Sequence, residues 1–223
     1  MKRPELEQLK KAGYEFTDPW DVVDIFEKKV AEFAGSRYAV ATDCCTHALF
    51  LSLIYTKETH HEIGTIAIPK NTYFSVPMVI KQAGFEFEFI DLTWIGGYRL
   101  GYTAIWDMAV CWKKDMYRGG TCCLSFQIKK NIPIGRGGMI LLDNFAAYEE
   151  LKLMRYDGRD MDTDRMDKNH ITRSGYHMYM TPEDAARGII LMDQTRDMPD
   201  SYTWKDYPDL TKIKYYENRQ STE

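Results

Sequence analysis

The sequence predicts an α/β fold with a mostly parallel central sheet. Short apolar segments that are typical of buried strands alternate along the chain with longer segments whose apolar residues recur at helical spacing. Strands separated by helices favour a parallel sheet, because each helix carries the chain back to the edge where the next strand begins. The chain has 223 residues, of which 44% are hydrophobic, so one large domain can bury a substantial core.

The helices are predicted from apolar periodicity and from residues that start or end a helix. Residues 21–33 carry apolar side chains at helical spacing, and Gly35 follows them. Thr181 precedes another such segment and has Asp184 three residues later, a pattern typical of a capped helix start. We therefore expect helices over residues 21–33, 46–55, 75–83, 145–155 and 182–192.

The strands are predicted from short apolar runs that lie between turn residues. Residues 85–92 alternate between apolar and acidic side chains at their start, and Gly84 stands directly before them. The other runs are shorter and almost wholly apolar, as expected of strands that are covered on both faces. We expect strands over residues 37–42, 64–69, 85–92, 102–106, 121–126 and 139–142.

Charge and hydropathy argue against two classes of partner. Lys and Arg number 29 against 33 Asp and Glu, a formal charge of −4, so electrostatics gives no reason to expect binding to nucleic acid. No apolar run approaches the length that spans a bilayer, and the first residues lack the apolar core of a secretory signal. We expect a cytoplasmic protein without a nucleic-acid or membrane partner.

A lysine-containing turn follows the strand predicted at 121–126, in the segment CLSFQIKKNIPIGRGG that runs from Cys123 to Gly138. This segment resembles a signature of the DegT/DnrJ/EryC1/StrS family of pyridoxal-phosphate (PLP) sugar aminotransferases: aromatic-Ser-Phe, a spacer, Lys-Asn and Gly-Gly. The resemblance implies that Lys130 is the catalytic Schiff-base lysine and that Ser125 helps to hold the cofactor phosphate. Lysine suits this role because burial readily shifts its pKa. From this segment alone, a basic turn between two strands stays an alternative.

An aspartate ends another predicted strand, in the segment from Ala104 to Val110. This segment resembles the family's strand that ends in Glu-Asp-Ala-Ala-His/Gln. The resemblance implies that Asp107 is catalytic, because it pairs with the pyridine nitrogen of PLP and keeps that nitrogen protonated. The family's His or Gln is Val110 here, so one polar contact with the cofactor is missing. A turn or helix-capping role for Asp107 is the structural alternative.

Two earlier segments complete the predicted cofactor site. Residues 37–49 resemble the family's Ala-Val-x-x-x-Ser-Gly-Thr-x-Ala-Leu, which implies that Thr46 and the start of its helix bind the phosphate. Cys45 stands where the family has Gly, which argues against an equally close backbone approach. Residues 66–75 resemble Val-Pro-x-x-Thr-Phe/Trp, which implies that Tyr73 stacks on the cofactor ring, although an aromatic residue at this junction is also ordinary core.

A later segment implies a shared site. Residues 175–181 resemble the family's Gly-Tyr-Asn-x-Arg-Met-Thr, in which the Asn reaches the cofactor phosphate of the partner subunit. His177 takes the place of that Asn, and Tyr179 takes the place of the Arg. We therefore expect a homodimer or a higher symmetric oligomer, with His177 as a phosphate ligand for the partner's site.

Two lengths differ from the family pattern. Only fifteen residues separate Asp91 from Asp107, too few for the additional strand–helix unit that the family has between these positions. The resemblance also leaves no counterpart for the family's C-terminal small domain. We expect a PLP-binding-like α/β domain over residues 1–198, the core of a fold-type-I large domain, and a tail over residues 199–223.

The resemblance implies amino transfer onto a keto-sugar, in particular a nucleotide-linked one, with glutamate as amino donor. Two alternatives stay open. A related branch of PLP-dependent sugar dehydratases carries His at the lysine position, so Lys130 argues against that reaction. A degenerate, non-catalytic protein that acts as a scaffold or needs a partner chain is suggested by the changes at Cys45, Val110, His177 and Tyr179.

Overall fold

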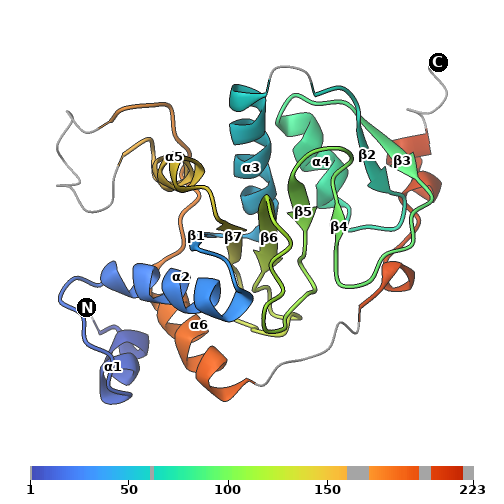
Figure 1. Ribbon diagram of the computed structural model, residues 1–223. Helices are drawn as coiled ribbons and strands as arrows, with labels where there is room; N and C mark the ends of the chain where they lie inside the picture. Colours follow the sequence, from blue (N-terminus) through green and yellow to red (C-terminus); the bar gives the residue numbers. More distant parts are fainter. Residues whose placement is uncertain (1, 61–62, 160–170, 196–201, 218–223) are drawn as a thin grey trace.

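In a computed structural model of the chain, residues 2–60, 63–159, 171–195 and 202–217 are described. Figure 1 shows their arrangement, with a five-stranded sheet at the centre and helices on both of its faces. An α/β fold is therefore confirmed. Among the described residues, no helix is both long enough and apolar enough to cross a membrane.

Every predicted helix and strand is present, with shifted ends. The helices are α2 (Asp21–Ala34), α3 (Cys45–Thr59), α4 (Ser75–Gln82), α5 (Phe145–Arg155) and α6 (Pro182–Gln194). The strands are β1 (Tyr38–Thr42), β2 (Ile66–Pro69), β3 (Phe87–Ile90), β5 (Ile105–Asp107), β6 (Thr121–Ser125) and β7 (Gly138–Leu142). The elements that the sequence analysis missed are short: α1 (Pro4–Lys11), β4 (Tyr98–Arg99), η2 (Trp204–Asp206), η3 (Leu210–Lys212) and α7 (Lys214–Glu217).

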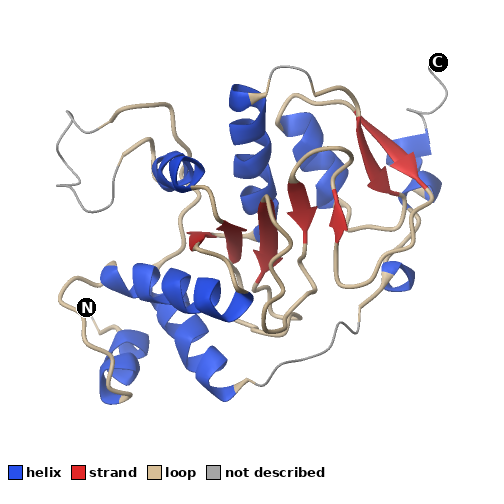
Figure 2. Ribbon diagram, in the orientation of Figure 1, coloured by secondary structure: helices blue, strands red, loops and turns tan. Residues whose placement is uncertain are grey.

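Strand direction differs from the mostly parallel arrangement predicted. The five-stranded sheet has the order β1-β7-β6-β5-β4, and only β5 and β6 run parallel in it, while its three other pairs are antiparallel. A separate two-stranded sheet pairs β2 with β3 in parallel. For β4 and β5 the reason lies in their connection, because residues 100–104 are too few for a crossover helix. Figure 2 shows how short these strands are.

Helices cover both faces of the central sheet, so β7 and the middle of β6 are apolar on both faces. Met139 and Leu141 of β7 pack with α1, α2 and α6, whereas Ile140 and Leu142 face the cluster that contains α3, α4 and α5. This alternation follows from the two-residue period of a strand. Polar side chains lie instead at the carboxyl ends of β5 and β6, where Asp107 and Ser125 are the last residues.

A buried ion pair fixes the helices beside β1. Arg155 of α5 is fully buried and contacts the carboxylate of Glu27 in α2. Arg155 also donates to the carbonyl oxygen of Ala41 at 2.8 Å, and the backbone N–H of Ala41 donates to Glu27 at 2.7 Å. Glu27, Ala41 and Arg155 thus join α2, β1 and α5. The buried charges of Glu27 and Arg155 are paired with each other, which offsets part of the cost of burying them.

Candidate active site

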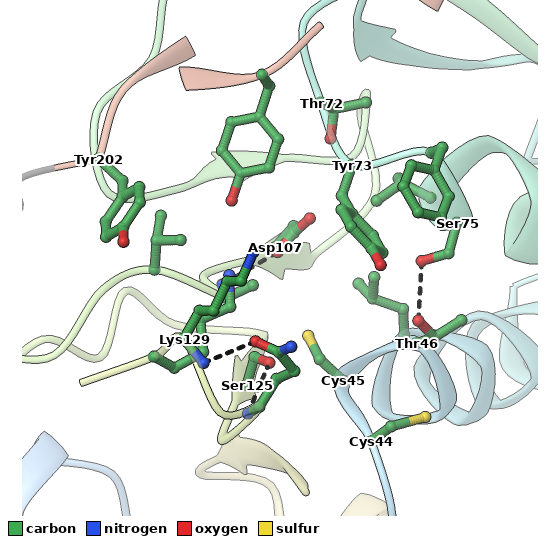
Figure 3. A pocket seen from close by; sticks show the side chains of 18 of the residues that line it. Cys44, Cys45, Thr46, Thr72, Tyr73, Ser75, Asp107, Ser125, Lys129 and Tyr202 are labelled. Atoms are coloured by element: carbon green, nitrogen blue, oxygen red, sulfur yellow. Dashed lines mark hydrogen bonds between the residues drawn. The ribbon is translucent and has the colours of Figure 1, made fainter. Parts of the chain in front are cut away.

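A cavity of about 540 Å³ lies at the carboxyl ends of β5 and β6. These two strands are parallel, so the residues that end them, Asp107 and Ser125, reach the same edge of the sheet. Six of the seven predicted site residues line the cavity, as Figure 3 shows for most of them: Cys45, Thr46, Tyr73, Asp107, Ser125 and Lys130.

Lys130 lies in the loop after β6, where its backbone N–H donates to the carbonyl oxygen of Gln127 at 2.8 Å and closes a turn. Burial lowers the pKa of its amine, and the negative charge of Asp107 acts in the opposite direction. The neighbouring Lys129 also lines the cavity but is exposed, whereas Lys130 is half-buried. Lys130 is thus the lysine of this pair whose amine is partly desolvated beside Asp107.

Asp107 is a buried carboxylate, with 6% of its surface exposed. The hydroxyl of Tyr98 donates to its Oδ2 at 2.9 Å, and the backbone N–H of Ala109 donates to its Oδ1 at 3.0 Å. Burial raises the pKa of Asp107, while the two hydrogen bonds and the positive charge of Lys130 oppose that rise. Both oxygens therefore have fixed donors, and each retains acceptor capacity.

The start of α3 forms the opposite wall. Its N-cap, Cys44, makes no side-chain capping bond, so the first backbone N–H groups of the helix lack a side-chain cap. Thr46 shares a hydrogen bond of 2.8 Å with Ser75 of α4, which fixes the two hydroxyls side by side (Figure 3). Gly138 of β7 packs directly behind this turn, because a Cβ on it would lie 2.4 Å from the carbonyl carbon of Cys44.

Cys45 and Tyr73 complete that wall. The Cys45 thiol lies 3.7 Å from the carbonyl oxygen of Cys123, and burial raises its pKa well above the ordinary value, so the thiol is neutral. Tyr73 is 48% exposed and points into the cavity in Figure 3, with its ring centroid 4.1 Å from that of Phe74. An exposed aromatic at a cavity wall can stack on a planar ligand.

Two cations share one carboxylate beside α3. Asp43 accepts hydrogen bonds from His47 at 2.5 Å and from Arg136 at 2.7 Å. The bond to Asp43 raises the pKa of His47 to about 9, so His47 is protonated at neutral pH. With Arg136 also lining the cavity, this three-residue group has a net positive charge, which favours an anion at the start of the helix.

The chain after residue 201 contributes cavity residues that the sequence analysis did not identify. It is attached by backbone hydrogen bonds from Trp204 to Trp94 at 3.1 Å and from Leu210 to Lys70 at 2.9 Å. This segment carries neither helical nor strand periodicity, although Thr203 and Asp206 form a capping box at η2. The predicted boundary between residues 198 and 199 lies outside the described residues. The cavity residues from this segment are Tyr202, Asp206 and Tyr207.

His177 lies apart from the six other predicted residues and is not among those that line the cavity. It forms an isolated bridge with Tyr156, and its Nδ1 lies 3.1 Å from a carboxylate oxygen of Asp157. Its side chain is 69% exposed, so a second copy of the chain could contact it. A contact with the partner's cofactor phosphate stays a prediction.

Comparison with solved structures places this architecture in the aminotransferase fold. AtS13 from Actinomadura melliaura superposes with a TM-score of 0.69 at 20% identity, over 85% of this chain and 64% of that one. The sugar aminotransferase CalS13 from Micromonospora echinospora gives 0.67 at 16% identity, over 86% and 64%. GDP-4-keto-6-deoxymannose-3-dehydratase (ColD), in a structure with bound GDP-perosamine, gives 0.67 at 17% identity, over 86% and 64%.

The sequence also matches a known family. The profile of the DegT/DnrJ/EryC1/StrS aminotransferase family matches residues 3–94 and 115–201, and the chain belongs to this family. The chain spans 64% of the length of each of the three solved structures. No curated protein matches it. The stretch between the two matched ranges, residues 95–114, contains β4 and β5 and therefore Asp107.

Proposed function

We propose that this protein is a PLP-dependent aminotransferase that transfers an amino group from glutamate to a nucleotide-linked keto-sugar. One observation carries the proposal: Lys130 and Asp107 line the same cavity, although they come from different strand ends and the chain between β3 and β5 is short. Had these residues only structural roles, a turn lysine and a capping aspartate would have no reason to share one buried cavity.

The side chains of the cavity fit PLP. Its partly desolvated amine can bond to the aldehyde of PLP, and its buried carboxylate can pair with the pyridine nitrogen. The helix start without a side-chain cap can bind the phosphate, and the exposed aromatic ring can stack on the planar ring. The net positive charge of the group formed by Asp43, His47 and Arg136 supports the phosphate position.

Each residue then has a defined task. When bound, PLP supplies an aldehyde that bonds to amines and a ring that withdraws electrons from the attached carbon. Lys130 would hold the cofactor through its Nζ and, once released, carry a proton at that atom. Asp107 would keep the ring nitrogen protonated, and Tyr73 would orient the ring. Thr46, Ser125 and the start of α3 would hold the phosphate, beside Cys45.

The substrate class rests on similarity to the sugar aminotransferase CalS13 and to the dehydratase ColD, whose structure contains GDP-perosamine. The exposed mouth of the cavity, where Lys129 and Arg136 lie, supports a substrate with a phosphate-bearing part outside the pocket.

Borohydride reduction in the presence of PLP tests the proposal directly. The purified protein should gain visible absorbance with PLP, lose it on reduction, and carry the reduced label on Lys130. The position is expected because the Lys130 amine is the partly buried one near Asp107. Peptide mapping by mass spectrometry locates the label.

The Lys129→Ala variant is the matched control and should be labelled like the unmodified protein. A label on Lys129 would show that the wrong lysine had been assigned. Absence of any specific label would contradict the enzyme proposal and favour the scaffold alternative.

A homodimer is part of the proposal, since His177 cannot serve its own cavity from its present position. Large apolar side chains around the cavity are exposed, including Tyr73 at 48%, Phe74 at 47% and Ile128 at 66%, and a second copy would cover them. Sedimentation velocity at micromolar concentration should show a dimer. A monomer at that concentration would contradict the shared site, and the His177→Ala variant should then bind PLP as tightly as the unmodified protein.

A further inference from the structure

Tyr98 is buried against Asp107 in a segment that lies outside the family match. It belongs to β4, a two-residue strand, and the antiparallel register places it directly opposite Asp107 of β5. Only 3% of its surface is exposed. Both residues lie within 95–114, the stretch that the family profile leaves unmatched. The contact between them therefore lies in the short connection between β3 and β6, outside the part of the chain that the family profile matches.

The hydrogen bonds around Tyr98 have a defined direction. Its hydroxyl donates to Oδ2 of Asp107 at 2.9 Å, since an ionised carboxylate can only accept. The same hydroxyl contacts Thr72 Oγ1, a buried group that precedes α4. Because the tyrosine proton is used toward Asp107, Thr72 must donate to Tyr98. This gives a buried chain from Thr72 through Tyr98 to Asp107.

Among the residues that the structure describes, Tyr98 is the side chain that donates a hydrogen bond to Asp107. Val110 lines the cavity nearby and is apolar, and the other donor to the carboxylate is the backbone N–H of Ala109. A buried carboxylate with a single rigid donor on one oxygen could rotate or take up a proton. The hydrogen bond from Tyr98 acts against both changes, and its ring is held in place by packing against Trp94 with the centroids 5.2 Å apart.

We propose that Tyr98 is a positioning residue for Asp107, whose hydroxyl orients the carboxylate and keeps it ionised for contact with a protonated heteroaromatic nitrogen. This inference rests on the proposed PLP chemistry for its purpose, but the effect of Tyr98 on Asp107 is a property of the protein alone. The two can therefore be tested separately.

The balance of charges around Asp107 supports this role. Burial raises its pKa, and the bonds from Ala109 and Tyr98, together with Lys130 from the loop after β6, act against that rise. The other titratable groups that face it are Cys45 of α3, Cys123 of β6 and Tyr207 of the C-terminal segment, and burial raises the pKa of each, so all three are neutral. Removing the Tyr98 hydroxyl should thus let the pKa of Asp107 rise further.

The test uses the Tyr98→Phe variant of the full chain without PLP. Carbon-detected NMR with carboxyl-labelled aspartate follows the titration of Asp107, which is assigned by the loss of its signal in Asp107→Asn. The pKa of Asp107 should move upward in Tyr98→Phe. Tyr102→Phe is the matched control, because Tyr102 is 99% exposed, and it should leave the titration unchanged. An unchanged or lowered pKa in Tyr98→Phe would overturn the proposal.

A second pair of variants guards against a Tyr98→Phe protein that does not fold. Thr72→Val removes the hydroxyl that orients Tyr98 and should move the pKa of Asp107 in the same direction, whereas Thr72→Ser keeps a hydroxyl and should restore it. A merely structural role for Thr72 would not give this difference. If Thr72→Val and Thr72→Ser titrate alike, the hydrogen-bonded chain has no influence on Asp107.

PLP binding then separates this inference from the proposed function. Tyr98→Phe should raise the dissociation constant of PLP about tenfold, as expected for the loss of one hydrogen bond to a charged group. Tighter binding by Tyr98→Phe would instead show that the tyrosine competes with the cofactor for Asp107, which overturns the positioning role. If neither the unmodified protein nor any variant binds PLP, the proposed function fails. The NMR titration then still decides whether Tyr98 positions Asp107.

Discussion

Replacing Lys130 by alanine should slow amino transfer from L-glutamate to the PLP-loaded protein at least about 10³-fold, the range in which loss of a general acid–base group falls. The reason is that, among the described residues that line the cavity, Lys130 is the one that combines an amine with partial burial beside Asp107. Rapid mixing with L-glutamate, followed by absorbance of the cofactor, measures this half-reaction without any sugar substrate.

Lys129→Ala is the matched control, because Lys129 is adjacent in sequence and exposed. It should retain the rate of the unmodified protein. The pH dependence gives a further readout: since burial lowers the pKa of Lys130, covalent capture of PLP should increase with pH through a lower pKa than that of an exposed lysine. A rate that survives in Lys130→Ala and falls in Lys129→Ala would exchange their roles.

Much of this fold could be predicted because its elements carry local signals. The predicted helix over 21–33 and the observed α2 differ by one residue at the end, where Gly35 adopts a left-handed φ of 80° that ends the helix. Strands β6 and β7 are apolar on both faces, and Asp107 and Ser125 fall at strand ends where polar residues interrupt the apolar run. Cavity residues near such ends could be identified from sequence.

The remaining features depend on packing between distant segments. Tyr98 belongs to a strand of two residues, too short to give any periodicity, and its position follows only from its register with β5. The segment after residue 201 lies against β3 through ring contacts such as that between Phe89 and Tyr216, at 5.4 Å (Figure 1). The antiparallel direction of β4 likewise depends on the length of a loop. His177 needs a second chain for its predicted role.

Replacing Asp107 by asparagine should leave covalent PLP capture by Lys130 intact and slow the half-reaction with L-glutamate about 10²- to 10³-fold, as for other losses of a preorganised charge in an active site. Asparagine keeps the size of the side chain and can still accept from Tyr98, but it lacks the negative charge that favours a protonated ring nitrogen. It also presents an NH₂ group in place of one acceptor, so the bond from Ala109 or that from Tyr98 must weaken.

The control is Asp91→Asn, an exposed aspartate that pairs with Lys70 at 3.0 Å, and its rate should not change. A PLP analogue methylated at the ring nitrogen carries a fixed positive charge, so it should restore part of the rate in Asp107→Asn. The double variant Tyr98→Phe/Asp107→Asn should be no slower than Asp107→Asn alone, because a residue that acts through Asp107 has nothing left to position. Full activity in Asp107→Asn would remove the carboxylate from the mechanism, and an additive loss in the double variant would give Tyr98 an independent role.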